Sequence, residues 1–138
     1  MSIWQPLRSG RVVLAAVVVL GGMAFVATPV GASTAAGPVC GPKTVTAHPA
    51  PGIGGQEVFT VGSAGTVTLL QQSTTTLKVT DVDPTQGWKD TVLSRTGTRP
   101  HVGFQQVGNP NDQERFWARM NTAGTPGTVI NVVIQSCT

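Results

Sequence analysis

Hydrophobic and polar residues alternate along most of the chain after residue 43, and turn-forming residues interrupt this alternation at short intervals. The period of two is clear in residues 66–69, 77–80 and 130–135. It is the signature of β-strands, in which successive side chains point to opposite faces of a sheet. No helix-length pattern with a period of 3.6 follows residue 32. We therefore predict an all-β fold: an immunoglobulin-like β-sandwich, or a small barrel, of about seven or eight antiparallel strands.

Short segments rich in glycine, proline, asparagine, aspartate and serine separate the alternating runs. Glycine tolerates positive φ, proline fixes φ, and asparagine and aspartate form turns through their own side chains. Their spacing suits short strands, and we expect both halves of the chain to share one core. The predicted turns are residues 49–55, 62–65, 72–73, 84–87, 95–100, 108–112 and 123–127.

The N-terminal residues have the three parts of a secretory signal peptide. Arg8 and Arg11 supply the positive charge, residues 12–26 form an apolar run, and residues 30–32 end in a small residue suited to cleavage. A retained membrane anchor is the alternative, but the apolar run is shorter than the roughly 20 residues that a membrane-spanning helix needs. We therefore predict cleavage after Ala32 and no membrane span in the mature chain.

This interpretation divides the chain into a signal peptide (1–32), a flexible leader (33–42) and a single β-sandwich domain (43–138). It also predicts that the protein is secreted to the extracellular space, with association with the cell envelope left open.

Cys40 and Cys137 are the only cysteines, and they lie near the two ends of the predicted mature chain. In an oxidising compartment we expect them to form a disulfide rather than to remain as two free thiols. Closing a loop of roughly 100 residues stabilises a fold by about 4.7 kcal/mol in the chain-entropy model. A zinc site would need further ligands, and neither His48 nor His101 has ligand-like spacing to a cysteine.

The charge of the mature chain argues against a nucleic-acid partner. The full sequence has nine lysine and arginine residues and six acidic residues. Because Arg8 and Arg11 leave with the signal peptide, the remaining charges nearly balance. Sequence-independent binding to nucleic acid depends on many clustered cations, and the sequence shows no such cluster.

The sequence also lacks the residue patterns of a catalytic or metal-binding site. No nucleophile lies in a G-x-S-x-G motif, no H-E-x-x-H motif is present, and we expect His48 and His101 to be surface residues. Asp81, Asp83 and the turn at 109–112 offer oxygen atoms to Ca²⁺, but such residues are common in turns without an ion. We predict a protein that is not an enzyme and has no cofactor and no metal.

Two tryptophans follow the predicted signal peptide, and we expect different roles for them. Trp88 follows a turn and is expected to be a core anchor. Trp117 lies in a strand in which Phe116, Ala118 and Met120 form the core side. Arg115, Trp117 and Arg119 then face solvent together, unless the register slips by one residue. One interpretation is structural, with the arginine side chains covering the ring. The other is functional, because Arg and Trp are enriched at the centres of protein interfaces.

We therefore predict a small, secreted, non-catalytic β-sandwich that binds a protein or a cell-envelope component. Arg115, Trp117 and Arg119 are the candidate binding residues on a strand. Arg95 and Arg99 are candidates in the turn at 95–100. A secreted enzyme inhibitor that inserts this turn is the alternative function. The partner and the oligomeric state do not follow from the sequence.

Overall fold

The computed structural model describes residues 36–138, so the predicted signal peptide and the first residues of the leader lie outside it. This part of the chain contains nine strands and no helix, and thus no helix that crosses a membrane. The strands are β1 (Thr44–Pro49), β2 (Gln56–Val61), β3 (Gly65–Gln71), β4 (Leu77–Pro84), β5 (Trp88–Ser94), β6 (Thr96–Gly97), β7 (His101–Gln106), β8 (Asn109–Met120) and β9 (Val129–Cys137).

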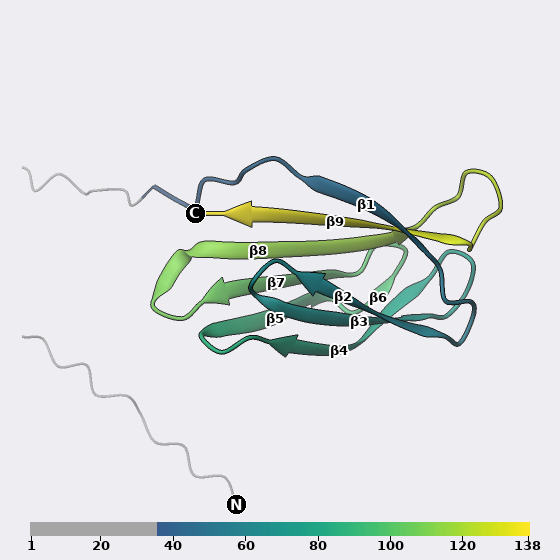
Figure 1. Ribbon diagram of the computed structural model, residues 1–138, viewed down its shortest axis with the longest axis horizontal. Coiled ribbons are helices and arrows are strands. Elements are labelled where there is room, and N and C mark those ends of the chain that lie inside the picture. The colour runs from purple at the N-terminus through teal and green to yellow at the C-terminus, as the bar shows by residue number, and fades with distance from the viewer. Residues whose placement is uncertain (1–35) are drawn as a thin grey trace, which may run out of the picture. The chain divides into compact units, whose positions relative to one another are not determined.

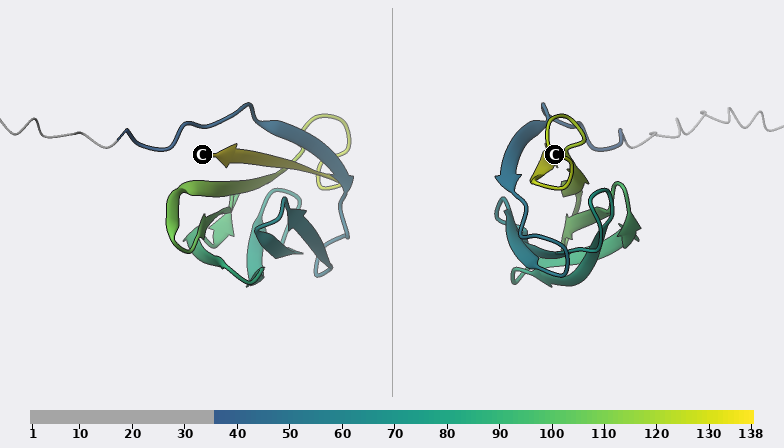
Figure 2. Two further views of the ribbon diagram at one scale, coloured as in Figure 1. Left: turned by 60° about the vertical axis from the view of Figure 1, so that its left-hand side comes forward. Right: turned by 90° about the vertical axis from the view of Figure 1, so that its right-hand side faces the viewer.

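The strands form two antiparallel sheets that face each other in a sandwich-like arrangement (Figures 1 and 2). The five-stranded sheet has the order β1-β9-β8-β7-β5, and the four-stranded sheet has the order β2-β3-β4-β6. The prediction of an all-β fold is confirmed. The strand count exceeds the prediction because the two-residue strand β6, which pairs with Leu77 and Lys78 of β4, forms inside a segment predicted as a turn.

The core lies between the sheets and takes alternate residues from the strands of both. Phe59 of β2 and Phe116 of β8 meet across the two layers, with ring centroids 6.0 Å apart. Burying each large apolar side chain stabilises the fold by about 1.5 to 3 kcal/mol. Trp88, the predicted core anchor, is half-buried and packs against this cluster. The other buried members are Val61, Ala64, Val67, Leu69, Leu77, Val79, Val102, Phe104, Ala118, Met120, Ile130 and Val132.

The predicted disulfide is confirmed, and it joins the two ends of the described chain within the five-stranded sheet. Cys40 and Cys137 lie directly opposite each other in an antiparallel bridge, with Cα atoms 3.9 Å apart. Reciprocal backbone hydrogen bonds between Val39 and Thr138, of 2.8 and 2.9 Å, flank this pair. The Cα separation is below the usual range of about 4.4 to 6.8 Å. Its short value fits a non-hydrogen-bonded antiparallel pair, in which opposite Cα atoms approach most closely.

The prediction of a loop at residues 108–112 is wrong. The turn between β7 and β8 has only two residues, Val107 and Gly108, and β8 begins at Asn109, which pairs with Gln106. The next three residues bulge out before the regular pairing starts at Gln113. Nε2 of Gln105 and Nε2 of Gln113, from the residues on either side, each donate to the carbonyl of Pro110 at 2.9 Å. The strand was missed because asparagine, proline and aspartate are typical of turns.

Candidate binding surface

The outer face of the five-stranded sheet carries Arg115, Trp117 and Arg119 of β8. Phe116 and Ala118 lie between these three residues in the strand. They are 0% and 1% exposed and belong to the core. Alternation along the strand therefore turns the other set to the solvent side, where Trp117 and Arg115 are half-buried and Arg119 is exposed. The register is the one expected from the sequence.

Neighbouring strands complete a row of side chains across this face. Trp117 pairs with His101 of β7 on one side and with Val133 of β9 on the other. Val133 in turn pairs with Val45 of β1, which is 62% exposed. The row therefore combines two aromatic rings with two valines on the solvent side of the sheet.

Cationic and aromatic groups surround the indole of Trp117. The His101 ring stacks on it with centroids 4.6 Å apart and an interplanar angle of 23°. Nζ of Lys43 lies 5.4 Å from the indole centroid, and Cζ of Arg99 lies 5.8 Å from it. Such contacts stabilise an exposed aromatic ring by about 0.5 to 1 kcal/mol each. They explain how a tryptophan is held in place on the outside of a sheet.

His101 is the one described residue in this row whose charge depends on pH. Burial lowers the pKa of its imidazole, and the positive charges of Arg115 and Arg99 lower the pKa further. Its Nε2 atom is buried without a hydrogen-bond partner. Both observations favour a neutral imidazole stacked on the indole at neutral pH.

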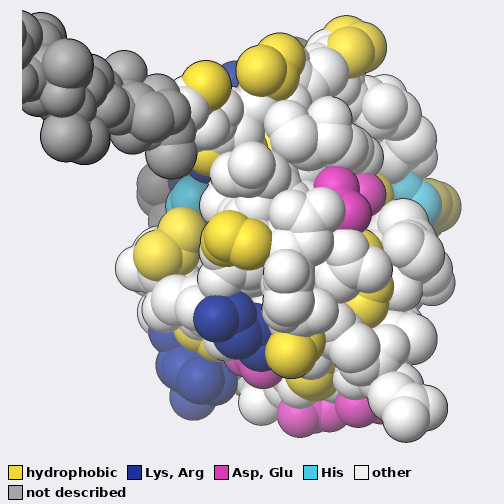
Figure 3. Space-filling view, turned by 90° about the vertical axis from the view of Figure 1, so that its left-hand side faces the viewer, with side chains coloured by type: hydrophobic (Ala, Val, Ile, Leu, Met, Phe, Trp, Pro, Cys, Tyr) yellow, Lys and Arg dark blue, Asp and Glu magenta, His cyan; other side chains and the backbone are white. Residues whose placement is uncertain are grey.

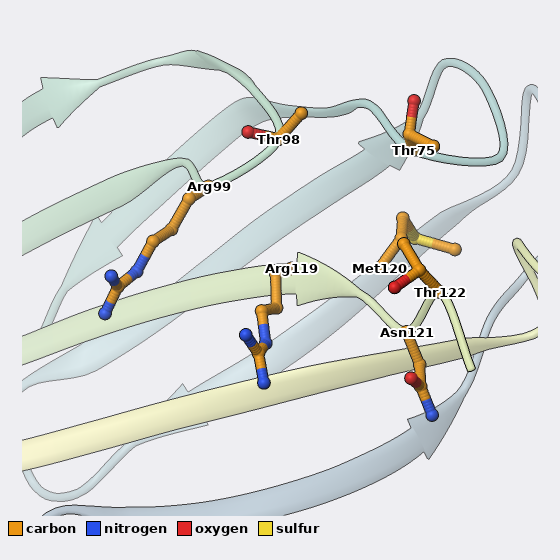
Figure 4. Close-up of a pocket in the computed structure, with 7 residues that line it drawn as sticks. All are labelled: Thr75, Thr98, Arg99, Arg119, Met120, Asn121 and Thr122. Atoms are coloured by element: carbon orange, nitrogen blue, oxygen red, sulfur yellow. The ribbon is translucent and has the colours of Figure 1, made fainter.

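One pocket lies beside Trp117, and a second pocket shares two lining residues with it. The first, of about 220 Å³, is lined by Trp117, Lys43, Arg99, Arg119 and Asn131, together with valines of β1 and β9. The second, of about 390 Å³, shares Arg99 and Arg119 with the first. Figure 4 shows this second pocket, where the guanidinium groups of both arginines extend to the same side, away from Thr75. The two arginines thus lie at the boundary between the pockets.

A third pocket, of about 430 Å³, includes His101, Gly103 and Arg115. Gly103 pairs with Arg115, and because it has no side chain it leaves the sheet surface open at that point. A Cβ atom at Gly103 would have its nearest neighbours at 3.9 Å, an ordinary contact distance. The indole of Trp117 therefore has recesses along β8 in both directions.

In the part of the chain that the structure describes, the cations of this surface have no acidic partner within ion-pair distance. Within residues 36–138 the only ion pair joins His48 and Glu57, with 3.9 Å between Nδ1 and Oε1. Lys43, Arg99 and Arg119 therefore line one pocket without a carboxylate in ion-pair contact. In the view of Figure 3, most of the visible lysine and arginine side chains gather at the lower left, next to hydrophobic side chains and close to acidic ones.

Arg95, the remaining candidate from the sequence, does not join this surface. Its Nη1 atom donates to the carbonyl of Val79 at 3.2 Å, and its own carbonyl accepts from the amide of Val79 at 2.7 Å. The segment continues through β6 and reaches β7 past Pro100, which is buried. Arg95 is therefore tied to the four-stranded sheet, whereas Arg99 lies beside Trp117.

The sequence interpretation missed Lys43 and His101 as members of the surface. The sequence indicates Lys43 only as the first residue of the domain, and His101 only as a surface histidine. Both reach Trp117 through sheet pairing of strands that lie far apart in the chain. The alternation of side chains along a strand indicates the face on which a residue lies, but it does not indicate which strands are neighbours in the sheet.

A second polar cluster lies at the edge strand β1. Nε2 of His48 lies 3.1 Å from Oγ1 of Thr46, and Glu57 follows at the ion-pair distance given above. The His48 ring also meets the Phe59 ring edge-on, with centroids 5.1 Å apart. The 3.9 Å separation of imidazole and carboxylate is too long for a hydrogen bond. No group of three or more metal-ligating side chains occurs in the described part of the chain.

Comparisons with protein-family models, with curated proteins and with solved structures found no match.

Proposed function

We propose that this protein is a secreted, non-catalytic binding protein, and that the outer face of its five-stranded sheet is the binding surface. One observation carries the proposal: Trp117 lies on the solvent side of the sheet beside Lys43, Arg99 and Arg119, with Arg115 two residues along β8, and within residues 36–138 no carboxylate is in ion-pair contact with these cations. Tryptophan and arginine are the residue types that dominate the energetics of protein interfaces. The surface is therefore the best candidate for contact with a partner.

A purely structural role accounts less well for this arrangement. Four like charges close together repel one another and lower the stability of the folded state. Exposed cation–π contacts stabilise the folded state by only about 0.5 to 1 kcal/mol each. A partner that covers the indole and supplies negative charge would offset this repulsion.

The disulfide supports export, because such bonds persist mainly outside the reducing cytosol. We infer an immunoglobulin-like sandwich in outline, with one difference. The disulfide here joins neighbouring segments of one sheet, whereas immunoglobulin domains bridge their two sheets around a buried tryptophan. Architecture of this kind carries no function by itself.

The alternative of an enzyme inhibitor makes a separate prediction. An inhibitor that inserts residues 95–100 would cause stoichiometric loss of activity in a panel of secreted proteases and glycosidases. The hydrogen bonds between Arg95 and Val79 hold the start of this segment on β4. They give no support to a freely protruding loop, and we retain the sheet surface as the main proposal.

A capture experiment tests the proposal. The purified protein is immobilised and exposed to culture supernatant and envelope extract, and bound material is compared with that of Trp117→Ala. The matched control is Val58→Ala, which removes a side chain that is 61% exposed on the other sheet. We expect a partner that Trp117→Ala loses and Val58→Ala keeps. Identical bound material for all three proteins would contradict the proposal.

A further inference from the structure

The pocket beside Trp117 has the chemistry of a site for an anionic group. Lys43 precedes β1, Arg99 lies between β6 and β7, and Arg119 lies on β8, so three separate elements bring one cation each to a pocket of about 220 Å³. Asn131 of β9, which pairs with Arg119, adds an amide to the same pocket. Arginine binds carboxylates through paired, charge-assisted hydrogen bonds.

This concentration of charge contrasts with the rest of the chain. Residues 36–138 contain seven lysine and arginine residues and six acidic residues, so they are nearly neutral as a whole. Three of the seven cations, Lys43, Arg99 and Arg119, line the pocket beside Trp117, and a fourth, Arg115, lies two residues away on the same face of β8. The charge complementary to this part of the surface is negative.

Exposed apolar side chains on the same face of the sheet favour one class of anionic partner over the others. Val45 and Leu93 are 62% and 61% exposed on this side of the sheet, and Val133 lies between Val45 and Trp117. An acidic protein segment contains both carboxylates and apolar side chains and satisfies both features. A single-stranded nucleic acid needs aromatic faces free for stacking bases. Here the His101 ring already stacks on the indole.

We propose that the pocket formed by Lys43, Arg99, Arg119 and Trp117 binds a side-chain carboxylate of an acidic, partly apolar segment of a partner protein. This inference rests on the proposed function and specifies the class of partner. The carboxylate lies among the three cations, and apolar residues next to it in the segment contact Trp117, Val133 and Val45. Exposed cations make such binding sensitive to salt, because the Debye length falls to about 10 Å at 0.1 M.

Binding of a model peptide tests the inference. The probe is a ten-residue peptide of alternating glutamate and valine, titrated by calorimetry into the purified protein. We expect Lys43→Gln and Arg119→Gln each to weaken binding by about fivefold, as for one lost ion pair. The matched control is Lys78→Gln, which removes the same charge from β4 of the other sheet and should leave binding unchanged. Equal affinity in all four proteins, or no binding of the peptide at all, would overturn the inference.

Two other polymers extend the test. Polygalacturonate presents carboxylates without apolar side chains, and a single-stranded oligonucleotide presents phosphates and bases. We expect both to bind more weakly than the peptide. Tighter binding of either one would assign the pocket to a glycan or to a nucleic acid and would overturn the proposal of a protein segment.

A second readout separates binding in this pocket from general charge attraction. A carboxylate bound beside Arg99 offsets the charge that lowers the pKa of His101. The pKa measured by NMR should therefore rise when the peptide is bound, and it should rise less in Arg119→Gln. An unchanged pKa in the presence of bound peptide would place the peptide elsewhere.

The outcomes also distinguish this inference from the proposed function. If the captured partner depends on Trp117 but not on Lys43 or Arg119, the surface binds a partner without a carboxylate in this pocket. The proposed function then stands and the inference fails. If the partner depends on none of the three residues, both fail.

Discussion

The position of His101 makes the stability of the protein depend on pH. Its folded-state pKa is lowered from the usual 6.5, mainly by burial and then by Arg115 and Arg99. Below about pH 6.5 the unfolded chain therefore binds more protons at this residue than the folded chain does. We expect His101 to stabilise the fold fully above that pH, and to lose part of this contribution as the pH falls toward its folded-state pKa.

Urea unfolding of the wild type and of His101→Gln checks this prediction. The difference in unfolding free energy between the two proteins should favour the wild type more at about pH 7.5 than at about pH 5. A difference that is the same at both pH values would show that His101 does not titrate abnormally in the folded state.

Gln71 is a buried residue whose side chain forms hydrogen bonds with two loops. Its side chain is almost fully buried, at 1% exposure. Oε1 accepts a hydrogen bond from the amide of Gly52 at 3.0 Å, and Nε2 donates to the carbonyl of Gly127 at 2.9 Å. The residue thus connects the loop after β1 and the loop before β9 to the end of β3. The predicted turn at 72–73 begins directly after it, and no local pattern indicates that its polar side chain is buried.

We expect Gln71→Leu to lower the free energy of unfolding by about 1 to 3 kcal/mol, because it removes two partly buried hydrogen bonds, to the amide of Gly52 and the carbonyl of Gly127. Gln72→Ala, at the exposed neighbouring position, should change it by less than about 0.5 kcal/mol. Urea denaturation of both variants measures the difference. Equal stability of the two variants would show that water molecules replace the two hydrogen bonds of the Gln71 side chain.

The strand β3 requires a glycine at its first residue. Gly65 has a φ of 150° and pairs with Pro84 of β4, where an added Cβ atom would collide with the carbonyl oxygen of Asp83. Backbone atoms of a paired strand cannot move aside cheaply. We expect Gly65→Ala to lower the free energy of unfolding by about 2 to 4 kcal/mol.

Gly103 provides the matched control, because it lies in β7 with ordinary space for a Cβ atom. Gly103→Ala should change the stability by less than about 1 kcal/mol, in the stabilising direction, since glycine weakens a strand interior. Thermal unfolding of the two variants tests the contrast. A destabilisation of similar size in both would contradict the steric argument.

At the level of elements, the sequence predicted most breaks between strands but not all pairings. Turns predicted at 62–65, 72–73 and 84–87 fall between or at the ends of observed strands, because glycine, proline and serine define turns locally. The start of β8 was missed because residues 109–112 have the composition of a turn, although Asn109 pairs with Gln106 of β7. The two-residue strand β6 was missed because it exists only through its pairing with β4.

The candidate surface was predictable only in part for the same reason. The orientation of Trp117 follows from alternation along one strand. Its neighbours His101, Lys43 and Arg99 depend on the order of strands within the sheet, which no local pattern encodes. The separation of Arg95 from Arg99 likewise arises because the chain crosses from one sheet to the other between them.

For the whole molecule, the disulfide is the main covalent constraint. It joins residues 97 positions apart, so it restricts nearly the entire unfolded chain that follows Cys40. We expect the double variant Cys40→Ser/Cys137→Ser to lower the free energy of unfolding by about 2 to 5 kcal/mol. Urea unfolding of the variant and of the wild type, with and without reductant, measures this effect. If reductant destabilises the variant as much as the wild type, the bridge is not the cause.

The central claim is that the outer face of the five-stranded sheet binds a partner. NMR spectra of the isotope-labelled protein, recorded with and without the captured partner, test it most directly. If this face is the binding surface, the largest signal changes occur at the Trp117 indole N–H and at residues of β1, β8 and β9. Changes confined to β2, β3 and β4 of the other sheet would contradict it.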